Sequence, residues 1–155
     1  IGVDVNRVIL ELAKVLGASF VINSRETKPV EAVMEITKGG ADVAVDALGI
    51  AETCVSAMLS LAKSGRHLQI GITTKKEAGY VSLPVDIMVY KELKMIGSIG
   101  MSPHRYASMI PMVVQKQLTP GKMVSREISL SEVESIFESM TKSATTGTFV
   151  VTQFK

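Results

Sequence analysis

The sequence predicts an α/β protein built on a doubly wound parallel sheet. Strand-like and helix-like segments alternate through residues 1–71 in three successive units, and glycines close most of these segments. The stretch at 39–49, GGADVAVDALG, is a short apolar run between turn signals, which is typical of a strand buried on both faces. Repeated strand–helix units of this kind form parallel sheets with right-handed crossovers.

The first half of the chain follows this pattern element by element. Apolar residues at helical spacing predict helices that end at glycines, and short β-branched or apolar runs predict the strands between them. We expect, in order, a strand at 1–5, a helix at 7–16, a strand at 20–22, a helix at 29–38, a strand at 41–47, a helix at 51–63 ended by Gly65, and a strand leading into Gly71.

The second half is more irregular. Residues 72–85 form a polar loop, and 94–99, KMIGSI, predict another strand. A helix starts at Ser102 and continues to Leu118, with a kink at Pro111 because proline removes one helical hydrogen bond. Further on, Ser129 and Glu132 have the spacing of a capping box, which predicts a helix after them. Residues 149–151 form a terminal strand.

Composition and charge exclude several classes of partner. The net charge is +2 and the charges are scattered, so we expect no nucleic-acid partner and no membrane. No apolar run approaches the ~20 residues of a membrane helix. The single cysteine, Cys54, cannot form an internal disulfide, which suits a reducing compartment and predicts a cytoplasmic location.

The length of the chain fits one domain. A chain of 155 residues can bury roughly two-thirds of its unfolded surface. It begins at Ile1 without a methionine, inside an apolar stretch. We therefore expect a fragment of a longer protein.

Acidic Asp4 is the sharpest candidate for ligand binding. It ends a predicted strand just before a helix, where a carboxylate can accept hydrogen bonds from both ribose hydroxyls of an adenosine group. The same carboxylate would repel a 2′-phosphate, so Asp4 predicts NAD rather than NADP. An alternative for this position stays open, in which Asp4 or Asn6 only caps the following helix. The role of Arg7 is also open: it lies along the adenine or a phosphate, or it is solvated.

Ligands of open α/β sheets bind outside the carboxyl ends of the strands, which places Ala47, Leu48 and Gly49 at a ligand site. The glycine-rich phosphate loop, G-x-G-x-x-G, belongs about twenty residues before the ribose acid and would precede Ile1. The sequence thus predicts a Rossmann-type sheet that lacks its first strand and glycine loop.

No residue of this chain is predicted to be catalytic or to bind a metal. The two histidines and Cys54 do not have the spacing of a zinc site. The Cys54 thiol is predicted to be buried and structural. Asp46 is expected to hydrogen-bond the turn that follows its strand.

Nearly the whole chain resembles the cofactor-binding domain of the zinc-dependent, medium-chain alcohol dehydrogenases. The resemblance is carried by VDVNRVILELAKVLGASFVINS, by DALGIAETCVSAMLSLAKSGRHLQIGI, and by LPVDIMVYKELKMIGSIGM with the adjoining SPHRY. It implies hydride transfer between an alcohol or aldehyde and NAD, with zinc held in segments outside this chain. It also implies a homo-oligomer that forms through residues 94–100. The chain alone is expected to be inactive.

The resemblance also implies individual roles. Asp4 would bind the adenosine ribose. The other implied contacts lie at strand ends: Ala47 and Leu48 line the cofactor cleft, Ile70, Gly71 and Ile72 pass the nicotinamide ring, and Ser98, Ile99 and Gly100 present backbone groups to its carboxamide, as does Ile70. Residues 1–145 would form the partial NAD-binding domain and 146–155 a strand returning toward a catalytic domain.

Two features depart from the family, and three alternatives stay open. Gly147, Thr148 and Phe149 stand where many relatives carry a basic residue that reaches the pyrophosphate, and Pro111 interrupts a helix.

The alternatives are a zinc-free quinone reductase of the same superfamily, a methyltransferase, and a non-catalytic module that keeps only the fold. Asp4 counts against the first alternative, because quinone reductases usually prefer NADPH. The strand at 94–99 is unlike the antiparallel final strand expected of a methyltransferase.

Overall fold

The structure is a computed structural model that describes residues 1–141 and 145–154. These residues form two compact units, Ile1–Gly100 and Met101–Lys155, and each unit is described by itself. The predicted change of domain at 145 falls beside residues 142–144, which lie outside the described residues, as does Lys155 in the predicted return strand. The domain assignment stays a prediction.

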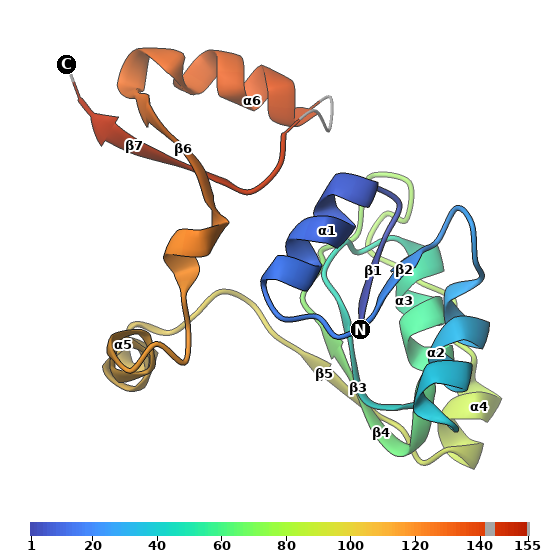
Figure 1. The fold of residues 1–155 in the computed structure, drawn as a ribbon. Helices are drawn as coiled ribbons and strands as arrows, with labels where there is room; N and C mark the ends of the chain where they lie inside the picture. The colour runs from blue at the N-terminus through green and yellow to red at the C-terminus, as the bar shows by residue number, and fades with distance from the viewer. Residues whose placement is uncertain (142–144, 155) are drawn as a thin grey trace. The chain divides into compact units, whose positions relative to one another are not determined.

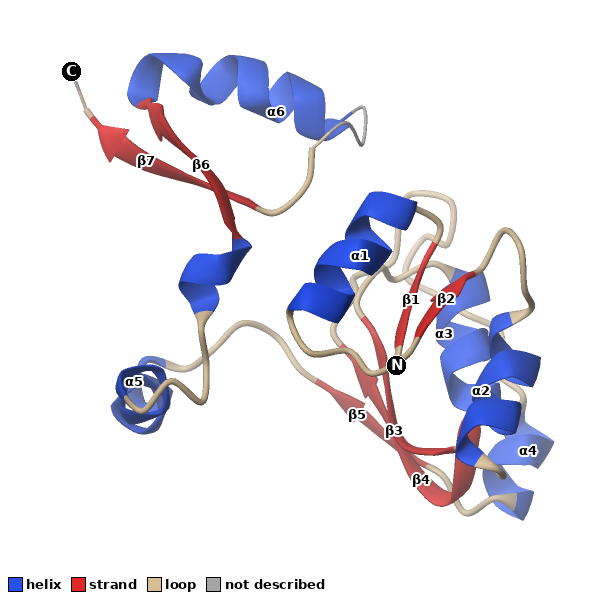
Figure 2. Ribbon diagram, in the orientation of Figure 1, coloured by secondary structure: helices blue, strands red, loops and turns tan. Residues whose placement is uncertain are grey.

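The first unit alternates strands and helices as predicted (Figures 1 and 2). Its elements are β1 (Gly2–Asp4), α1 (Arg7–Val15), β2 (Val21–Asn23), α2 (Pro29–Thr37), β3 (Ala41–Asp46), α3 (Ala51–Leu59), β4 (Leu61–Gln69), α4 (Val85–Tyr90) and β5 (Lys94–Gly97).

All strand pairs in this unit are parallel, which confirms the predicted fold class. They form two separate ladders, β1–β2 and β3–β4–β5. The registers include Asp4 opposite Asn23 and Asp46 opposite Gln69. Among the described residues no hydrogen-bonded ladder joins β1 to β3. This gap lies where the sequence analysis expects a further strand between the two ladders.

Each ladder has its own buried core. Leu10 and Ile22 are buried where α1 packs on β1 and β2. Met58 and Leu61 are fully buried where α3 packs on β3 and β4. Asn6 is the N-cap of α1, and its side chain accepts a hydrogen bond from the Val8 N–H. This confirms one of the two capping residues considered in the sequence.

The helix expected at 51–63 is shorter in the structure. The α3 helix ends at Leu59, and β4 begins at Leu61, before the predicted stop at Gly65. The Lys91 ammonium donates to the carbonyls of Leu59 and Leu61 at 3.1 and 2.7 Å, which satisfies acceptors at this chain reversal. Burial of Leu61 and pairing with β3 therefore overrode the helical periodicity.

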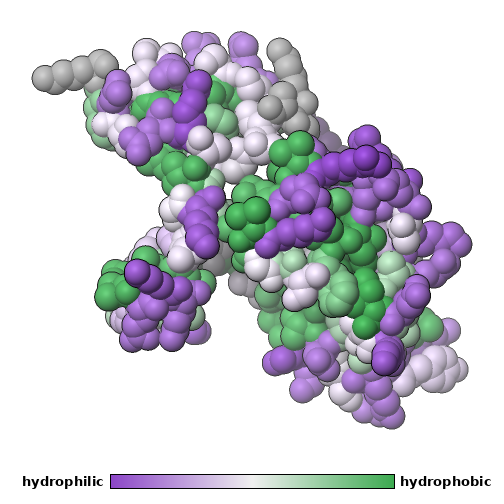
Figure 3. Space-filling model, in the orientation of Figure 1, coloured by the Kyte–Doolittle hydropathy of each residue, from purple (hydrophilic) through white to green (hydrophobic). Residues whose placement is uncertain are grey.

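The prediction that β3 is buried on both faces is wrong for the described residues. Val43 and Val45 are 45% and 51% exposed, whereas Asp46 at the end of the strand is buried. The α2 and α3 helices pack on β3 and stand on one side of it (Figure 1). Figure 3 shows an apolar surface over α1 and the strands near the N-terminus. The uncovered valines thus belong to a face and edge that lack a packing partner.

The last part of the unit holds an element that the sequence analysis missed. The α4 helix follows the predicted polar loop, and β5 covers 94–97 of the strand expected at 94–99. The prediction that β5 is an edge strand is confirmed, because it pairs with β4 alone. All four of its residues are exposed.

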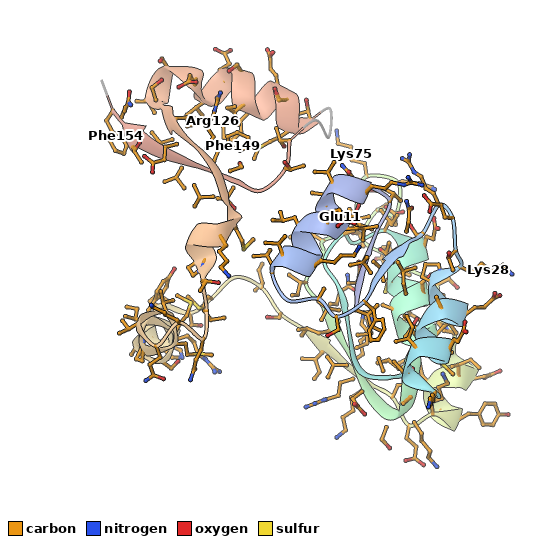
Figure 4. The ribbon with its side chains drawn as sticks, in the orientation of Figure 1. Glu11, Lys28, Lys75, Arg126, Phe149 and Phe154 are labelled. Atoms are coloured by element: carbon orange, nitrogen blue, oxygen red, sulfur yellow. The ribbon has the colours of Figure 1, made fainter. Side chains whose placement is uncertain are left out.

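The second unit contains a parallel βαβ arrangement. Its elements are a short 3-10 helix at Pro103–Arg105, α5 (Tyr106–Val114), a 3-10 turn at Pro120–Met123, β6 (Val124–Ser129), a 3-10 turn at Leu130–Glu132, α6 (Val133–Thr141) and β7 (Thr148–Gln153), with β6 paired to β7. The β6 strand was not predicted. Arg126 of β6 stacks over the ring of its register partner Phe149, 5.9 Å from the centroid (Figure 4).

Two predictions in this unit have clear outcomes. The capping box is confirmed, because the Glu132 carboxylate accepts hydrogen bonds from the Ser129 N–H and hydroxyl, both at 2.9 Å. The helix expected to reach Leu118 ends at Val114 instead. Lys116 takes a left-handed φ of 59°, which stops the helix. Pro111 does lie inside α5, and the kink stays a prediction. Among the described residues no helix is long and apolar enough to cross a membrane.

Candidate functional site

The carboxyl ends of β3, β4 and β5 meet at one edge of the three-stranded sheet. The Asp46 carbonyl accepts hydrogen bonds from the N–H groups of Ile70 and Gly71, both at 2.9 Å. The Gln69 carbonyl accepts one from the Ser98 N–H at 3.0 Å. The structure thus brings together the turn after β3, the turn after β4 and the end of β5, as the sequence predicted for the segments around 47, 70 and 98.

Asp46 organises the turn after β3. Its Oδ1 accepts hydrogen bonds from Leu48 N at 3.0 Å, Gly49 N at 3.2 Å and Thr53 Oγ1 at 2.9 Å. Burial pushes the pKa of Asp46 upward, but the hydrogen bonds, led by the one from Gln69, outweigh burial and hold the pKa below its ordinary value. The expectation that Asp46 hydrogen-bonds the following turn is confirmed.

Two glycines let the turns after β3 and β4 touch through their backbones. A Cβ on Gly49 would collide with the carbonyl of Ile72, and a Cβ on Gly71 would collide with the backbone of Gly49. Gly49 also has a φ of +88°, which favours glycine. The contact fixes one turn against the other. Gly97 and Gly100, by contrast, have nothing within 4 Å of an added Cβ, so a ligand has room to approach that backbone.

Gln69 links the turn after β3 to the turn after β4 through hydrogen bonds. The sequence analysis did not identify this residue. Its amide nitrogen donates to Asp46 Oδ2 at 2.7 Å and to the Gly71 carbonyl at 2.8 Å. Its oxygen pairs with Nε2 of His67 at 2.8 Å. Because that oxygen can only accept, His67 carries its proton on Nε2. The signal that could have identified Gln69 is its position opposite Asp46 in the β3–β4 register. That position is known only once the two strands are paired.

His67 is fully buried beneath the edge. Among the described residues its Nδ1 has no hydrogen-bond partner. The Cys54 thiol lies 3.9 Å from its Nε2, and burial, aided by the charge of Asp46, raises the pKa of that thiol. The prediction that Cys54 is buried is confirmed, and its purely structural role stays a prediction. The described residues hold no cluster of three or more potential metal ligands.

Apolar side chains surround the edge and stay accessible. Leu48 and Ile70 are exposed beside the paired turns, and Ile72 and Ile99 are among the most exposed apolar side chains of the unit. Ala47 is exposed as well. Apolar walls beside fixed backbone donors and acceptors form a surface suited to a flat, partly apolar ring.

Asp4 and Arg7 belong to the other ladder of the same unit. Asp4 ends β1 and is partly exposed, and its Oδ1 accepts a hydrogen bond from the Asn6 N–H at 2.8 Å. Arg7 is 80% exposed and forms an ion pair with Glu26 at 2.7 Å. The hydrogen bond to Glu26 and the charge of that carboxylate raise the pKa of Arg7. Arg7 is thus held by a partner that the sequence analysis did not identify.

The first unit is a parallel sheet with helices between its strands, and an acid, Asp4, ends β1. This arrangement is that of a Rossmann-type nucleotide-binding domain, in which ligands bind at the carboxyl ends of the strands. Residues 1–115 match the family described as zinc-binding dehydrogenase. The chain belongs to this family. Membership excludes the methyltransferase alternative.

Similar proteins agree with this assignment. The chain is 24% identical over 140 residues to a sorbitol dehydrogenase of Halalkalibacterium halodurans, and the aligned region covers 90% of this chain and 40% of the relative. It is 27% identical over 141 residues to an NAD-dependent alcohol dehydrogenase of Sulfurisphaera tokodaii, covering 90% and 39%. The crystal structure of an alcohol dehydrogenase from Aeropyrum pernix matches with a TM-score of 0.80 and 27% identity, over 96% of this chain and 41% of that one. The chain thus spans about two-fifths of the length of these relatives.

Proposed function

We propose that this chain is the NAD-binding part of a zinc-dependent alcohol dehydrogenase, an enzyme that transfers a hydride between an alcohol and NAD. The observation that carries the proposal is the shared edge where the ends of β3, β4 and β5 are locked together in a chain of this family. The named relatives are an alcohol dehydrogenase and a sorbitol dehydrogenase, which supports a small alcohol or aldehyde as substrate. A location in the cytoplasm is part of the proposal.

The residues at the strand ends fit a dinucleotide. The Asp4 carboxylate would accept hydrogen bonds from the ribose hydroxyls, and Arg7 would lie beside the adenosine. Exposed Leu48, Ile70 and Ile72 would form apolar walls beside the nicotinamide ring, which supplies the hydride acceptor when the cofactor is bound. These groups hold the ring in place and exclude water, which brings the reacting carbon into a productive position.

The backbone of the paired turns would orient the nicotinamide. Ala47 and Gly71 bring main-chain groups to the edge, and Ser98, Ile99 and Gly100 present theirs beyond β5, next to glycines whose surroundings are open. A carboxamide needs one donor and one acceptor at fixed places, and backbone groups provide both. The described residues do not fit a zinc site, so we place the zinc ligands in segments outside this chain.

The first test concerns cofactor choice. The complete protein is expected to prefer NAD to NADP by at least about tenfold, roughly 1.4 kcal/mol, because Asp4 accepts from the ribose and repels a 2′-phosphate. Asp4→Ala should remove most of this preference, as measured by kcat/KM for both cofactors. Asp42→Ala, which removes an exposed acid at the start of β3, should leave the preference unchanged.

Equal use of both cofactors by the unmutated enzyme would remove the support that Asp4 gives to the assignment. A preference for NADPH together with an absence of zinc from the purified complete protein would favour the quinone reductase alternative. Failure of the complete protein to bind either cofactor would favour a non-catalytic module.

The second test concerns association through the exposed edge. The β5 strand pairs on one side only, and its Met95 and Ile96 are exposed. Apolar edge strands pair readily with another strand, so we propose that residues 94–100 join two copies of the complete protein. Met95→Lys with Ile99→Lys should give monomers by light scattering, because two lysines in each copy would face each other across the edge.

A matched double variant controls for the added charge. Val85→Lys with Val89→Lys places two lysines at exposed apolar positions of α4 and should leave the dimer intact. If the edge variant stays dimeric at the same protein concentration, the interface lies elsewhere.

A further inference from the structure

Glu26 gathers three hydrogen-bond donors on one oxygen. Its Oε1 accepts from Arg7 Nε at 3.1 Å, Arg7 Nη2 at 2.7 Å and Asn23 Nδ2 at 2.8 Å. The turn beneath it is held by its backbone, because the N–H groups of Glu26 and Thr27 both donate to the Asn23 carbonyl at 3.0 Å. The carboxylate is therefore presented by an ordered turn rather than by an isolated flexible side chain.

This cluster adjoins the predicted ribose acid. Asn23 is the register partner of Asp4, and the Ser24 N–H donates to the Asp4 carbonyl at 3.1 Å. Arg7, Asn23 and Glu26 also line one hollow of about 510 Å³ that lies against α1, β2 and α2. Glu26 thus acts at the end of the β1–β2 pair, where Asp4 would meet the adenosine.

Glu26 engages two of the three guanidinium nitrogens through which Arg7 could bind a phosphate. Arginine binds phosphate best through two N–H groups of its planar fork. Nε and Nη2 of Arg7 form one side of that fork, and both donate to Glu26. With these donors engaged, Arg7 offers a 2′-phosphate less than a free arginine would, and the Glu26 carboxylate adds repulsion.

We propose that Glu26 is a second determinant of cofactor choice, which acts by holding the Arg7 fork away from a 2′-phosphate. Discrimination against NADP then has two parts. Asp4 repels the phosphate directly, and Glu26 occupies donors of Arg7 that could otherwise bind the phosphate. The inference rests on the proposed function, because it needs the adenosine to lie at the end of β1.

Binding of adenosine 2′-monophosphate and adenosine 5′-monophosphate to the complete protein tests this by calorimetry at fixed ionic strength, without any catalytic turnover. Glu26→Gln should raise the affinity for the 2′-monophosphate about fivefold, which corresponds to about 1 kcal/mol, because the Arg7 donors become available to the phosphate. In an Arg7→Met background the same substitution should have no effect, since the fork is absent. All the substituted side chains are more than half exposed, and melting curves check that each variant is folded.

Glu31→Gln is the matched control. Glu31 also forms an exposed ion pair, with Lys28 at 2.9 Å, so it reports the general effect of removing one surface charge. An equal gain from Glu31→Gln, a gain from Glu26→Gln that persists with Arg7→Met, or no gain at all would each overturn the role of Glu26. If the adenosine 5′-monophosphate binds in all variants, the proposed function survives such a result. If no variant binds either nucleotide, both proposals fail.

Discussion

Residues 1–155 alone are expected to form no stable, NAD-binding monomer. Within the part of the chain that the structure describes, β1 pairs with β2 alone and β3 with β4 alone. Val3 and Val5 are 46% and 47% exposed near one open edge, and Val43 and Val45 are similarly exposed near the other. A strand between the two ladders would cover both edges.

The expected loss is large compared with the stability of a domain. Each backbone hydrogen bond that the open edges lack forgoes roughly 0.5–1.5 kcal/mol, and each valine left uncovered forgoes up to about 1.5–3 kcal/mol. A typical domain has only about 5–15 kcal/mol of net stability. The isolated chain should therefore be molten, aggregate, or take a strand from another chain. The β7 strand adds a further edge, because its one partner among the described strands is β6.

Thermal unfolding of the dilute chain followed by calorimetry, together with an NAD titration, measures this directly. Two substitutions sharpen the test in the complete protein. Val45→Lys should unfold it, because a strand between the two ladders would cover this side chain. Val89→Lys on α4 should be tolerated, because nothing is expected to cover Val89, which is 68% exposed in this chain. Cooperative unfolding of a dilute monomer with saturable NAD binding would contradict this account of the sheet.

Asp46→Ala in the complete protein is expected to lower the free energy of unfolding by about 3 kcal/mol. Asp46 is 3% exposed, and its removal leaves the N–H groups of Leu48 and Gly49 and one N–H of the Gln69 amide without their acceptor. The Thr53 hydroxyl keeps the Ile50 carbonyl as an acceptor. NAD affinity should fall as well, since the turn after β3 would lose its anchor.

Asp42→Ala is the matched control on the same strand. Asp42 is exposed, and such surface substitutions usually change stability by less than about 0.5 kcal/mol. Denaturant unfolding of both variants gives the comparison. A loss of similar size at both positions would mean that the Asp46 network adds nothing specific.

The stabilisation by Asp46 should depend on pH in a defined direction. Because the folded pKa lies below the ordinary value of 3.8, the carboxylate stabilises the fold fully above that value. The stabilisation is lost as the pH falls below 3.8 and through the lower folded pKa. The difference in unfolding free energy between wild type and Asp46→Asn should therefore be constant from pH 6 to about pH 5 and shrink in more acidic solution.

Local patterns in the chain were enough to predict much of the first unit. The positions of α1, α2 and β3 follow from hydrophobic spacing, from Pro29 at the start of a helix and from glycines at element ends. The capping box at Ser129 and Glu132 follows from two residue types three positions apart. These features depend on contacts within a few residues, so the sequence determines them without knowledge of the fold.

Other features depended on partners far away in the chain. The change from α3 to β4 is set by burial of Leu61 and by hydrogen bonds from Lys91, thirty positions away. Helical spacing continues past this point in the sequence and therefore predicts the wrong boundary. The β6 strand was missed for a similar reason, because its five exposed or half-exposed residues show no apolar pattern and only pairing with β7 makes it a strand.

The candidate site divides in the same way. Sequence alone determined that Asp4 stands at one strand end and that Asp46 hydrogen-bonds its own turn, and it predicted a ligand edge at the strand ends. Each of these needs only strand polarity and neighbouring residues. Tertiary structure alone decided that Gln69 bridges Asp46 to Gly71 and that Glu26 holds Arg7. Those contacts require two strands to be placed side by side in register, and a side chain's partner across a sheet cannot be known until that register is set.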